Sequence, residues 1–265
     1  MKPPFYDTIG FGTTVNALQS QSSSVGALLF YLNTDCSSMT PQKERKDTMK
    51  KLFFHPLWSI LVIPVLGLIY VTINREPPLP RTLYTDLDDT IPFLKYFIIP
   101  YMVWMPFLYL TLIYFYFKDR RLYFHTLLAY IGSVLICYGI YLTFQTTVPR
   151  LEMQDNDLLS RMVMFVYQND APYNCFPSIH CLSSYLLFIA ARKSPAIRIR
   201  VVVVIGFFAG AIIVSTVFVK QHVVMDVLAG VMLGHIVFSF VSTLLGLKKL
   251  GSVWMGKEEI YETRY

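Results

Sequence analysis

The apolar and polar residues of this chain are segregated into long blocks instead of alternating at short range. A helix that crosses a bilayer needs about 20 mostly apolar residues, and six blocks reach or approach that length. Leu, Ile, Phe and Tyr fill these blocks without the alternation of a transmembrane strand, which predicts helices and not a barrel. The predicted spans are Phe53–Ile73, Tyr96–Phe117, Tyr123–Thr147, Ile179–Ala191, Val201–Val219 and Val223–Leu247.

The composition favours the same class of protein. Hydrophobic residues make up 54% of the chain and charged residues 15%, whereas a typical soluble domain carries about 25% charged residues. A soluble enzyme, a disordered chain and a small secreted disulfide-rich protein are therefore disfavoured. The formal net charge is +6, but no soluble basic domain is evident, so nucleic acid is not expected as a partner.

The basic residues predict the orientation of the spans. Apart from Lys2, sixteen Lys and Arg residues cluster directly before the first span, in the second and fourth connections and after the last span, whereas the other three connections hold six. The positive-inside rule then places both termini in the cytoplasm. The connections after spans one, three and five would face outward, across what we expect to be the cell membrane.

The two ends of the chain are expected to lie outside the bundle. Residues 1–52 begin with a Ser-, Thr-, Gln- and Asn-rich stretch without the pattern of a signal peptide. We expect this segment to be disordered or weakly interfacial, with a translation start near Met39 or Met49 as an alternative. Residues 53–247 would form one six-helix membrane domain, and residues 248–265 a short cytoplasmic tail.

One acidic residue lies inside a predicted span, and a histidine precedes it by one helical turn. Asp226 follows His222 by four residues, and residues i and i+4 share a helix face. The carboxylate can therefore accept a hydrogen bond from one imidazole nitrogen and make the other a better nucleophile or base. A buried carboxylate in a span is costly and often functional. A pair that only joins helices, or a proton relay in a transporter, remains the alternative.

A second polar cluster, Pro177-Ser178-Ile179-His180, opens the fourth span. Pro177 and Ser178 suit the first turn of a helix, where free N–H groups attract anions. A capped helix with an interfacial histidine is the alternative interpretation. Cys175 and Cys181 flank this cluster, and their spacing leaves a disulfide open.

The predicted topology brings both clusters to one side of the membrane. Arg150 follows span three, and Lys220 precedes His222 in the connection between spans five and six. Two histidines, a carboxylate, two cations and a helix N-terminus suit a phosphate ester. A zinc ion held by His180, His222 and Asp226 is the competing hypothesis for the same side chains.

These motifs resemble those of the type 2 phosphatidic acid phosphatase superfamily, over roughly residues 53–247. Pro177-Ser178-Ile179-His180 is similar to the central Pro-Ser-Gly-His motif of that family. Ser215-Thr216, followed by His222 and Asp226, is similar to its last motif, Ser-Arg-x5-His-x3-Asp. The resemblance implies an all-α integral membrane protein whose six transmembrane helices form a bundle of this kind.

The chain departs from the family motifs at three points. Thr216 stands where the family has Arg, and Ile179 where it has Gly. The first motif, Lys-x6-Arg-Pro, is represented only by Arg150, with Arg161 as a fallback. Motifs loosened in this way resemble the branch that contains the inositol phosphorylceramide and sphingomyelin synthases.

The resemblance implies a membrane lipid phosphatase that acts without a metal or other cofactor. His222 would attack phosphorus and form a phosphohistidine, Asp226 would orient it, and His180 would transfer protons. Arg150, Ser178, Lys220 and Ser215 would bind the substrate, a lipid phosphate. A lipid phosphotransferase is the first alternative, and a non-enzymatic six-span transporter is the second.

An acidic run and a set of regularly spaced glycines are interpreted as structural features and not as parts of a functional site. Asp86, Asp88 and Asp89 form an acidic run in the first outward connection, which we expect to be a solvated surface. Glycines recur four residues apart in the fifth and sixth spans, at Gly206, Gly210, Gly230 and Gly234. Small residues at this spacing let helices approach closely, so the two spans are expected to pack against each other.

Overall fold

The structure is a computed structural model, and it describes residues 56–75, 78–151 and 157–245. The predictions for residues 1–52 and 248–265 therefore lie outside the described residues. The described residues form α-helices, two 3-10 helices and one pair of two-residue strands. The helical bundle predicted from the apolar blocks is thus confirmed as the main architecture.

Five described helical stretches are long and apolar enough to cross a membrane, which confirms the membrane character of the chain. The first joins the 3-10 helix η1 (Pro56–Leu61) to α3 (Val62–Ile73). The second joins η2 (Lys95–Phe97) to α5 (Ile98–Lys118). The others are α6 (Arg120–Thr143), α9 (Ile199–Phe218) and α10 (Val224–Leu244).

The fourth predicted span is shorter than its neighbours. It corresponds to α8 (Ile179–Lys193), which has 15 residues and a length of about 22 Å at the usual helical rise. The hydrocarbon core is about 30 Å thick, so α8 alone does not meet the length expected of a span. The described residues therefore support five candidate spans and one short helix among them.

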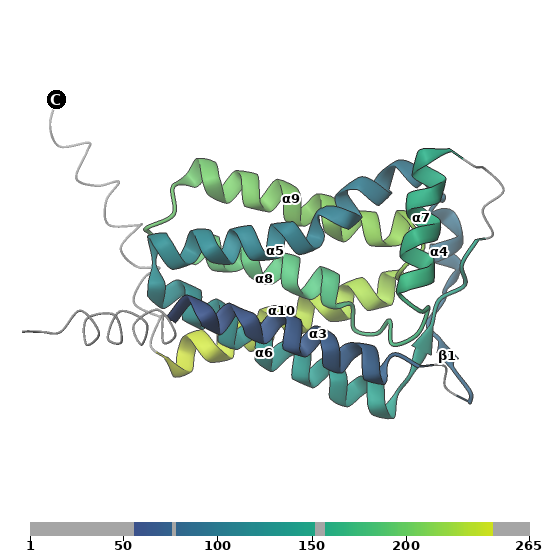
Figure 1. Ribbon diagram of the computed structural model, residues 1–265, viewed down its shortest axis with the longest axis horizontal. Coiled ribbons are helices and arrows are strands. Elements are labelled where there is room, and N and C mark those ends of the chain that lie inside the picture. Colours follow the sequence, from purple (N-terminus) through teal and green to yellow (C-terminus); the bar gives the residue numbers. More distant parts are fainter. Residues whose placement is uncertain (1–55, 76–77, 152–156, 246–265) are drawn as a thin grey trace, which may run out of the picture. The chain divides into compact units, whose positions relative to one another are not determined.

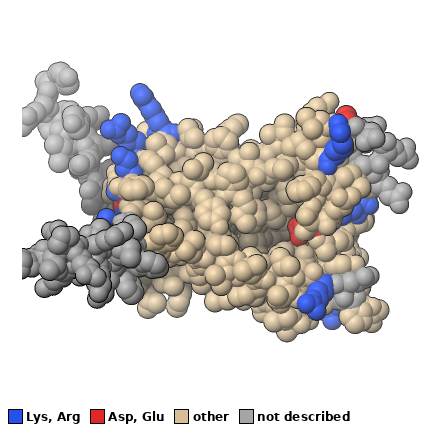
Figure 2. Space-filling view, in the orientation of Figure 1, with Lys and Arg blue, Asp and Glu red and all other residues tan. Residues whose placement is uncertain are grey.

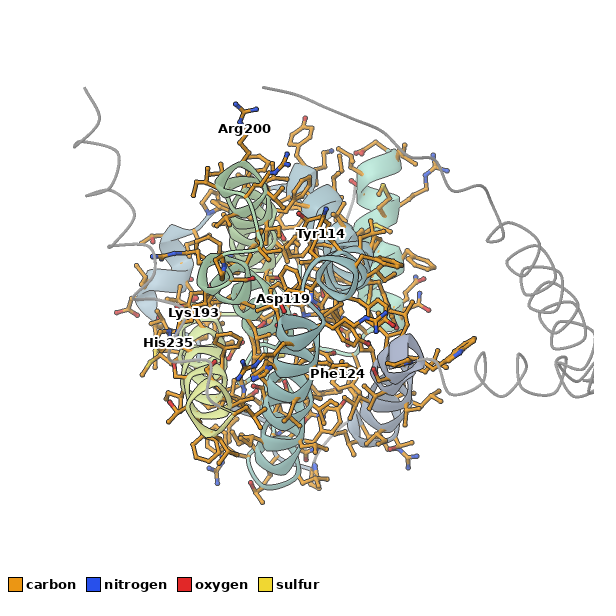
Figure 3. All side chains as sticks on the ribbon, turned by 90° about the vertical axis from the view of Figure 1, so that its left-hand side faces the viewer. Tyr114, Asp119, Phe124, Lys193, Arg200 and His235 are labelled. Carbon is orange, nitrogen blue, oxygen red and sulfur yellow. The ribbon has the colours of Figure 1, made fainter. Side chains whose placement is uncertain are left out.

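The short helix α8 is the centre of the bundle. It packs against α5, α6, α9 and α10, and Figure 1 shows these helices running alongside one another. At its C-terminal end, the Ser194 hydroxyl donates to Asp119 Oδ2 at 2.8 Å, in the turn between α5 and α6. Figure 3 faces this end, with Asp119 near the centre and Arg200 pointing outward. Because α8 is anchored at this end, its N-terminus lies part-way along its longer neighbours.

Three of the four glycines in α9 and α10 face α8 or its N-cap residue, so the prediction that these two helices pack against each other through their glycines is wrong. A Cβ at Gly230 would lie 2.5 Å from the Ser178 carbonyl oxygen, and one at Gly234 would lie 3.1 Å from the Leu182 carbonyl oxygen. A Cβ at Gly206 would lie 2.8 Å from the Phe188 ring, whereas Gly210 has nothing within 4 Å. The small residues therefore make room for the central helix.

The connections at the opposite end of the bundle are folded onto one another. Strand β1 (Arg81–Thr82) pairs in parallel with β2 (Thr146–Thr147), so the third span ends at Thr143, before the predicted Thr147. The apolar blocks of the sequence do not predict α7 (Leu158–Asn169), which contacts α5 and η2 at this end (Figure 1). Asp157 caps α7 and forms a 2.6 Å ion pair with Lys95.

The acidic run is only partly solvated. It forms the one-turn helix α4 (Asp86–Thr90), where Asp88 is 3% exposed. Asp88 Oδ2 accepts hydrogen bonds from the Thr85 N–H and hydroxyl, and Asp88 Oδ1 accepts one from the Val224 N–H. The expectation of a solvated surface is thus wrong for Asp88, which joins α4 to the start of α10.

Charged side chains are absent from the middle of the face shown in Figure 2. The Lys and Arg side chains lie towards its two ends. Among the described residues, one end carries Lys118, Arg120, Arg121, Arg192, Lys193, Arg198 and Arg200, and the other carries Arg75, Arg81, Lys95, Arg150, Arg161 and Lys220. A charge-free band between two charged ends is the pattern expected for a protein that crosses a bilayer.

Candidate active site

His222, Asp226 and His180 form a continuous chain of side chains. His222 Nδ1 lies 3.3 Å from Asp226 Oδ2, and His222 Nε2 lies 3.4 Å from His180 Nδ1. When Nδ1–H of His222 donates to the carboxylate, Nε2 keeps its lone pair and faces the second histidine. Asp226 is 1% exposed and His222 is 8% exposed. The two sequence motifs therefore meet in one buried arrangement.

A tight turn places His222 directly before α10. The Thr216 carbonyl accepts the N–H groups of Gln221 and His222 at 2.9 and 3.1 Å. Lys220 has a φ of 53°, in the left-handed region that non-glycine residues seldom occupy. Asp226 Oδ2 accepts the Val223 N–H at 3.1 Å. The carboxylate thus lies in the first turn of α10, where the helix dipole favours a negative charge.

Two aromatic rings of α5 contact His180, the second histidine of the pair. The His180 ring stacks on Tyr101, with centroids 4.8 Å apart, and lies 4.0 Å from the Trp104 ring centroid. Trp104 in turn donates from Nε1 to the Ser183 hydroxyl at 2.7 Å. Because both rings belong to α5, that helix fixes the orientation of the second histidine.

Ser178 caps the N-terminus of α8 and connects it to α10. Its hydroxyl accepts the Cys181 N–H at 3.3 Å, and its own N–H donates to the Asp226 carbonyl at 3.1 Å. The preceding residues are held by Thr146, whose hydroxyl oxygen accepts the N–H groups of Cys175 and Phe176. The N-terminus of α8 is therefore fixed beside the histidine pair.

Arg150 reaches the site through a glutamine. Its Nη2 donates to Gln221 Oε1 at 2.7 Å, its Nη1 donates to the Tyr167 carbonyl at 2.8 Å, and its guanidinium lies over the Tyr167 ring. Gln221 Nε2 is buried and has no hydrogen-bond partner among the described residues. Neither the family motifs nor the spacing of residues marks Gln221 as part of a site, and only its contact with Arg150 in the structure does.

Lys220 and Ser215 are not brought to the histidine pair. Lys220 Nζ donates to the carbonyls of Asp88 and Ile91, at 2.9 and 2.6 Å. The Ser215 hydroxyl donates to the Ile212 carbonyl in its own helix at 2.6 Å. These contacts hold Lys220 against the α4 connection and Ser215 against α9, and so assign neither side chain to phosphate.

A cavity of about 490 Å³ ends at the histidine pair. Its walls are mainly apolar and aromatic side chains of α3, α5 and α6, including Val71, Met102 and Met105. Figure 2 shows this face of the molecule hollowed between the helices. His180, Gln221 and His222 line the polar end. No Lys or Arg lines the cavity among the described residues.

Asp170 brings a carboxylate to the same polar end. It accepts hydrogen bonds from the Tyr70 hydroxyl and from Asn74 Nδ2, both at 3.1 Å. Burial raises the pKa of Asp170 above that of an ordinary carboxyl group, against the opposing effects of the Arg150 charge and the Tyr70 hydrogen bond. The cavity therefore joins an acidic polar end to an apolar body.

The side chains that lie close enough to share a metal ion differ from those expected. Within the described part of the chain, Cys175, His222 and Asp226 each place one ligand atom within 4.8 Å of the other two. His180 is not part of this group. The thiol of Cys175 is free, so the disulfide to Cys181 that the spacing left open is not formed.

Comparisons with known proteins identify the family. Searches of curated proteins and of solved structures returned no match to the chain. The family model described as the PAP2 superfamily matches residues 87–240, from α4 to α10. This region holds both motifs and covers more than half of the chain, and the protein therefore belongs to the PAP2 superfamily.

Proposed function

We propose that the protein is a membrane lipid phosphatase that acts through a phosphohistidine on His222. Phosphatase or lipid phosphotransferase chemistry is the general expectation for the superfamily. The observation that carries the proposal is the chain Asp226–His222–His180 at the end of an apolar cavity. Such an arrangement supplies an oriented nucleophile and a second group for proton transfer.

The reaction has two steps. His222 Nε2 attacks phosphorus while the ester P–O bond breaks, and protonated His180 gives its proton to the leaving oxygen. Water then gives a proton to His180 as its oxygen attacks the phosphohistidine, and the P–N bond breaks to release phosphate. Asp226 holds the Nδ1 proton of His222 and stabilises its positive charge in both steps. Substrate entry has to replace the 3.4 Å contact between the two histidines.

Neutral donors hold the phosphate oxygens in this proposal. The first N–H groups of a helix have no acceptor within it, and α8 begins at Ile179 and His180, which both line the cavity. Gln221 Nε2 is a further buried donor, oriented by Arg150 through Oε1. The Arg150 charge thus acts through one intervening side chain, and the N-terminus of α8 supplies positive potential.

The cavity walls support a lipid as the substrate. Apolar and aromatic side chains from three helices would contact acyl chains, while the phosphate lies at the histidines. We place the polar end on the outer side of the membrane and both termini in the cytoplasm, because the connections predicted to face inward are richer in Lys and Arg. The cell membrane is the compartment that we propose.

A lipid phosphotransferase is the second candidate, and Asp170 favours it. A carboxylate repels a phosphate monoester but accepts hydrogen bonds from the hydroxyl groups of an alcohol. Asp170 lies at the polar end of the cavity, where an acceptor alcohol would replace the attacking water. The two candidates share the first step and differ only in the group that attacks the phosphohistidine.

Turnover by the purified protein tests the proposal. We expect phosphate release from phosphatidic acid or a lipid diphosphate in water, and loss of release in His222→Asn. His235→Asn is the control, because His235 lies within α10, is not among the residues that line the cavity, and has its Nδ1 2.9 Å from the Tyr185 hydroxyl. Figure 3 labels His235. Product formation only with an added alcohol would support the transferase. Full turnover by His222→Asn would overturn both the phosphatase and the phosphotransferase. Solute flux without phosphate chemistry would support a transporter.

A further inference from the structure

Three potential metal ligands meet behind the proposed nucleophile. Cys175 comes from the connection before α8, His222 from the turn before α10, and Asp226 from the first turn of α10. One ligand atom from each lies within 4.8 Å of the other two. Cys175 is 5% exposed, and the other two are buried as described above. The group differs from a surface acidic cluster, because its three members are buried and chemically different.

The hydrogen bonds within the described residues leave this group incompletely satisfied. Asp226 uses Oδ2 for His222 and for the Val223 N–H, but its buried Oδ1 has no partner among the described residues. The Cys175 thiol donates a hydrogen bond to the Pro172 carbonyl at 3.6 Å, so Asp226 Oδ1 is the atom of the group left without a partner among the described residues. A buried carboxylate oxygen without a partner costs free energy, and a cation at this point would supply one.

The chemistry of the donors selects the kind of cation. Magnesium and calcium prefer sets of oxygen ligands, whereas a thiolate, an imidazole and a carboxylate together suit zinc and similar ions. Ligand atoms around tetrahedral zinc lie roughly 3.3–3.8 Å apart, so the group would close on the ion by about 1 Å. The cavity reaches His222, which gives the ion a path to the group.

We propose that Cys175, His222 and Asp226 form an inhibitory site for Zn²⁺ and cations of its class. A bound ion occupies the imidazole that would attack phosphorus and the carboxylate that orients it. The inhibition rests on the proposed function of His222, but binding of the ion does not. Cys175 has no part in the proposed reaction, so it separates metal binding from catalysis.

Cobalt substitution tests binding without any turnover. Co²⁺ added to the purified full-length protein is expected to give the near-ultraviolet charge-transfer band of a thiolate bound to cobalt, and Zn²⁺ should displace it. Cys175→Ser should remove the band. Cys137→Ser is the matched control, because it removes another buried thiol in α6, outside the group. Absence of the band in the unmodified protein, or its persistence in Cys175→Ser, would overturn the proposal.

Inhibition is then measured as the Zn²⁺ concentration that halves the metal-free rate of each variant on its preferred lipid phosphate. Loss of one of three ligands should raise that concentration by roughly tenfold or more in Cys175→Ser and leave Cys137→Ser unchanged. Equal sensitivity of the two variants would contradict the inhibitory site. A cobalt band in a protein without lipid phosphatase activity would instead support the metal site and reject the proposed function.

Discussion

Asp88 Oδ1 accepts a 2.8 Å hydrogen bond from the backbone N–H of Val224, two residues after His222. Its other oxygen caps the α4 turn through Thr85. The first outward connection is thereby fixed to the start of the helix that carries Asp226. Asp88 touches neither histidine, so we regard it as a positioning residue for the His222 turn.

Replacing Asp88 tests this role. Asp88→Ala removes a carboxylate acceptor from three donors, the Thr85 N–H and hydroxyl and the Val224 N–H. It should destabilise the fold by about 1.5–3 kcal/mol, with a lower kcat and a nearly unchanged KM. Thermal unfolding and steady-state kinetics measure the two effects, with the exposed Asp86→Ala as control. Equal behaviour of the two variants would show that the hydrogen bond to Val224 has no positioning effect.

Lys220 should act on stability and not on phosphate binding. Its ammonium group donates to the carbonyls of Asp88 and Ile91, so Lys220→Met leaves two acceptors without this partner. We expect a loss of about 1–3 kcal/mol in unfolding free energy and a KM within about twofold of the unmodified protein. A KM raised by tenfold or more in Lys220→Met, with stability unchanged, would contradict this prediction and support the phosphate-binding role that the sequence predicts for Lys220.

Gln221 is expected to contribute a donor in the transition state. Gln221→Leu keeps the size of the side chain but removes Nε2, and should lower kcat by roughly 100-fold with a smaller change in KM. Gln168→Leu is the control, because Gln168 lies exposed on α7. Steady-state kinetics on the preferred lipid phosphate decide the matter; an unaltered kcat would exclude the Gln221 amide from the reaction.

The glycines of α9 and α10 give opposite predictions for the same substitution. Gly230→Ala forces a Cβ to 2.5 Å from the Ser178 carbonyl, and should destabilise the protein by about 1–3 kcal/mol. Gly210→Ala meets nothing within 4 Å and should gain up to about 1 kcal/mol from helix propensity. Thermal unfolding in detergent compares the two. Similar melting temperatures would mean that α8 does not depend on the close approach of α10.

Asp170 predicts a pH-dependent difference in stability. Since burial raises its folded pKa, the folded state keeps a proton that the unfolded state releases, and stability falls as the pH rises between the two values. Asp170→Asn cannot titrate, so its stability relative to the unmodified protein should increase from about pH 4 upward and level off above the raised pKa. The free energy of unfolding of Asp170→Asn and of the unmodified protein, measured from about pH 4 upward, gives this difference in stability, with Asp86→Asn as control. A difference that does not change with pH would contradict the raised pKa of Asp170.

The amino-acid sequence by itself determined the features that depend on neighbours along the chain. Blocks of apolar residues without strand-like alternation predict the helices, because backbone polar groups in a membrane must be bonded within the protein and a helix bonds them within one segment. The four-residue spacing of His222 and Asp226 predicts their contact, and the structure forms it although His222 lies in the turn before α10 and not within the helix. The resemblance carried by the two motifs agrees with the family that matches residues 87–240.

Only the tertiary structure decided which distant side chains meet. Charge and position along the chain make Arg150 and Lys220 equivalent, but the path of the connections turns Lys220 towards α4 and places Arg150 behind Gln221. The same paths bury Asp88 and bring Cys175 to His222 and Asp226. Helix periodicity fixes contacts within one element, whereas contacts between elements depend on how the helices pack and on hydrogen bonds between connections that are far apart in the sequence.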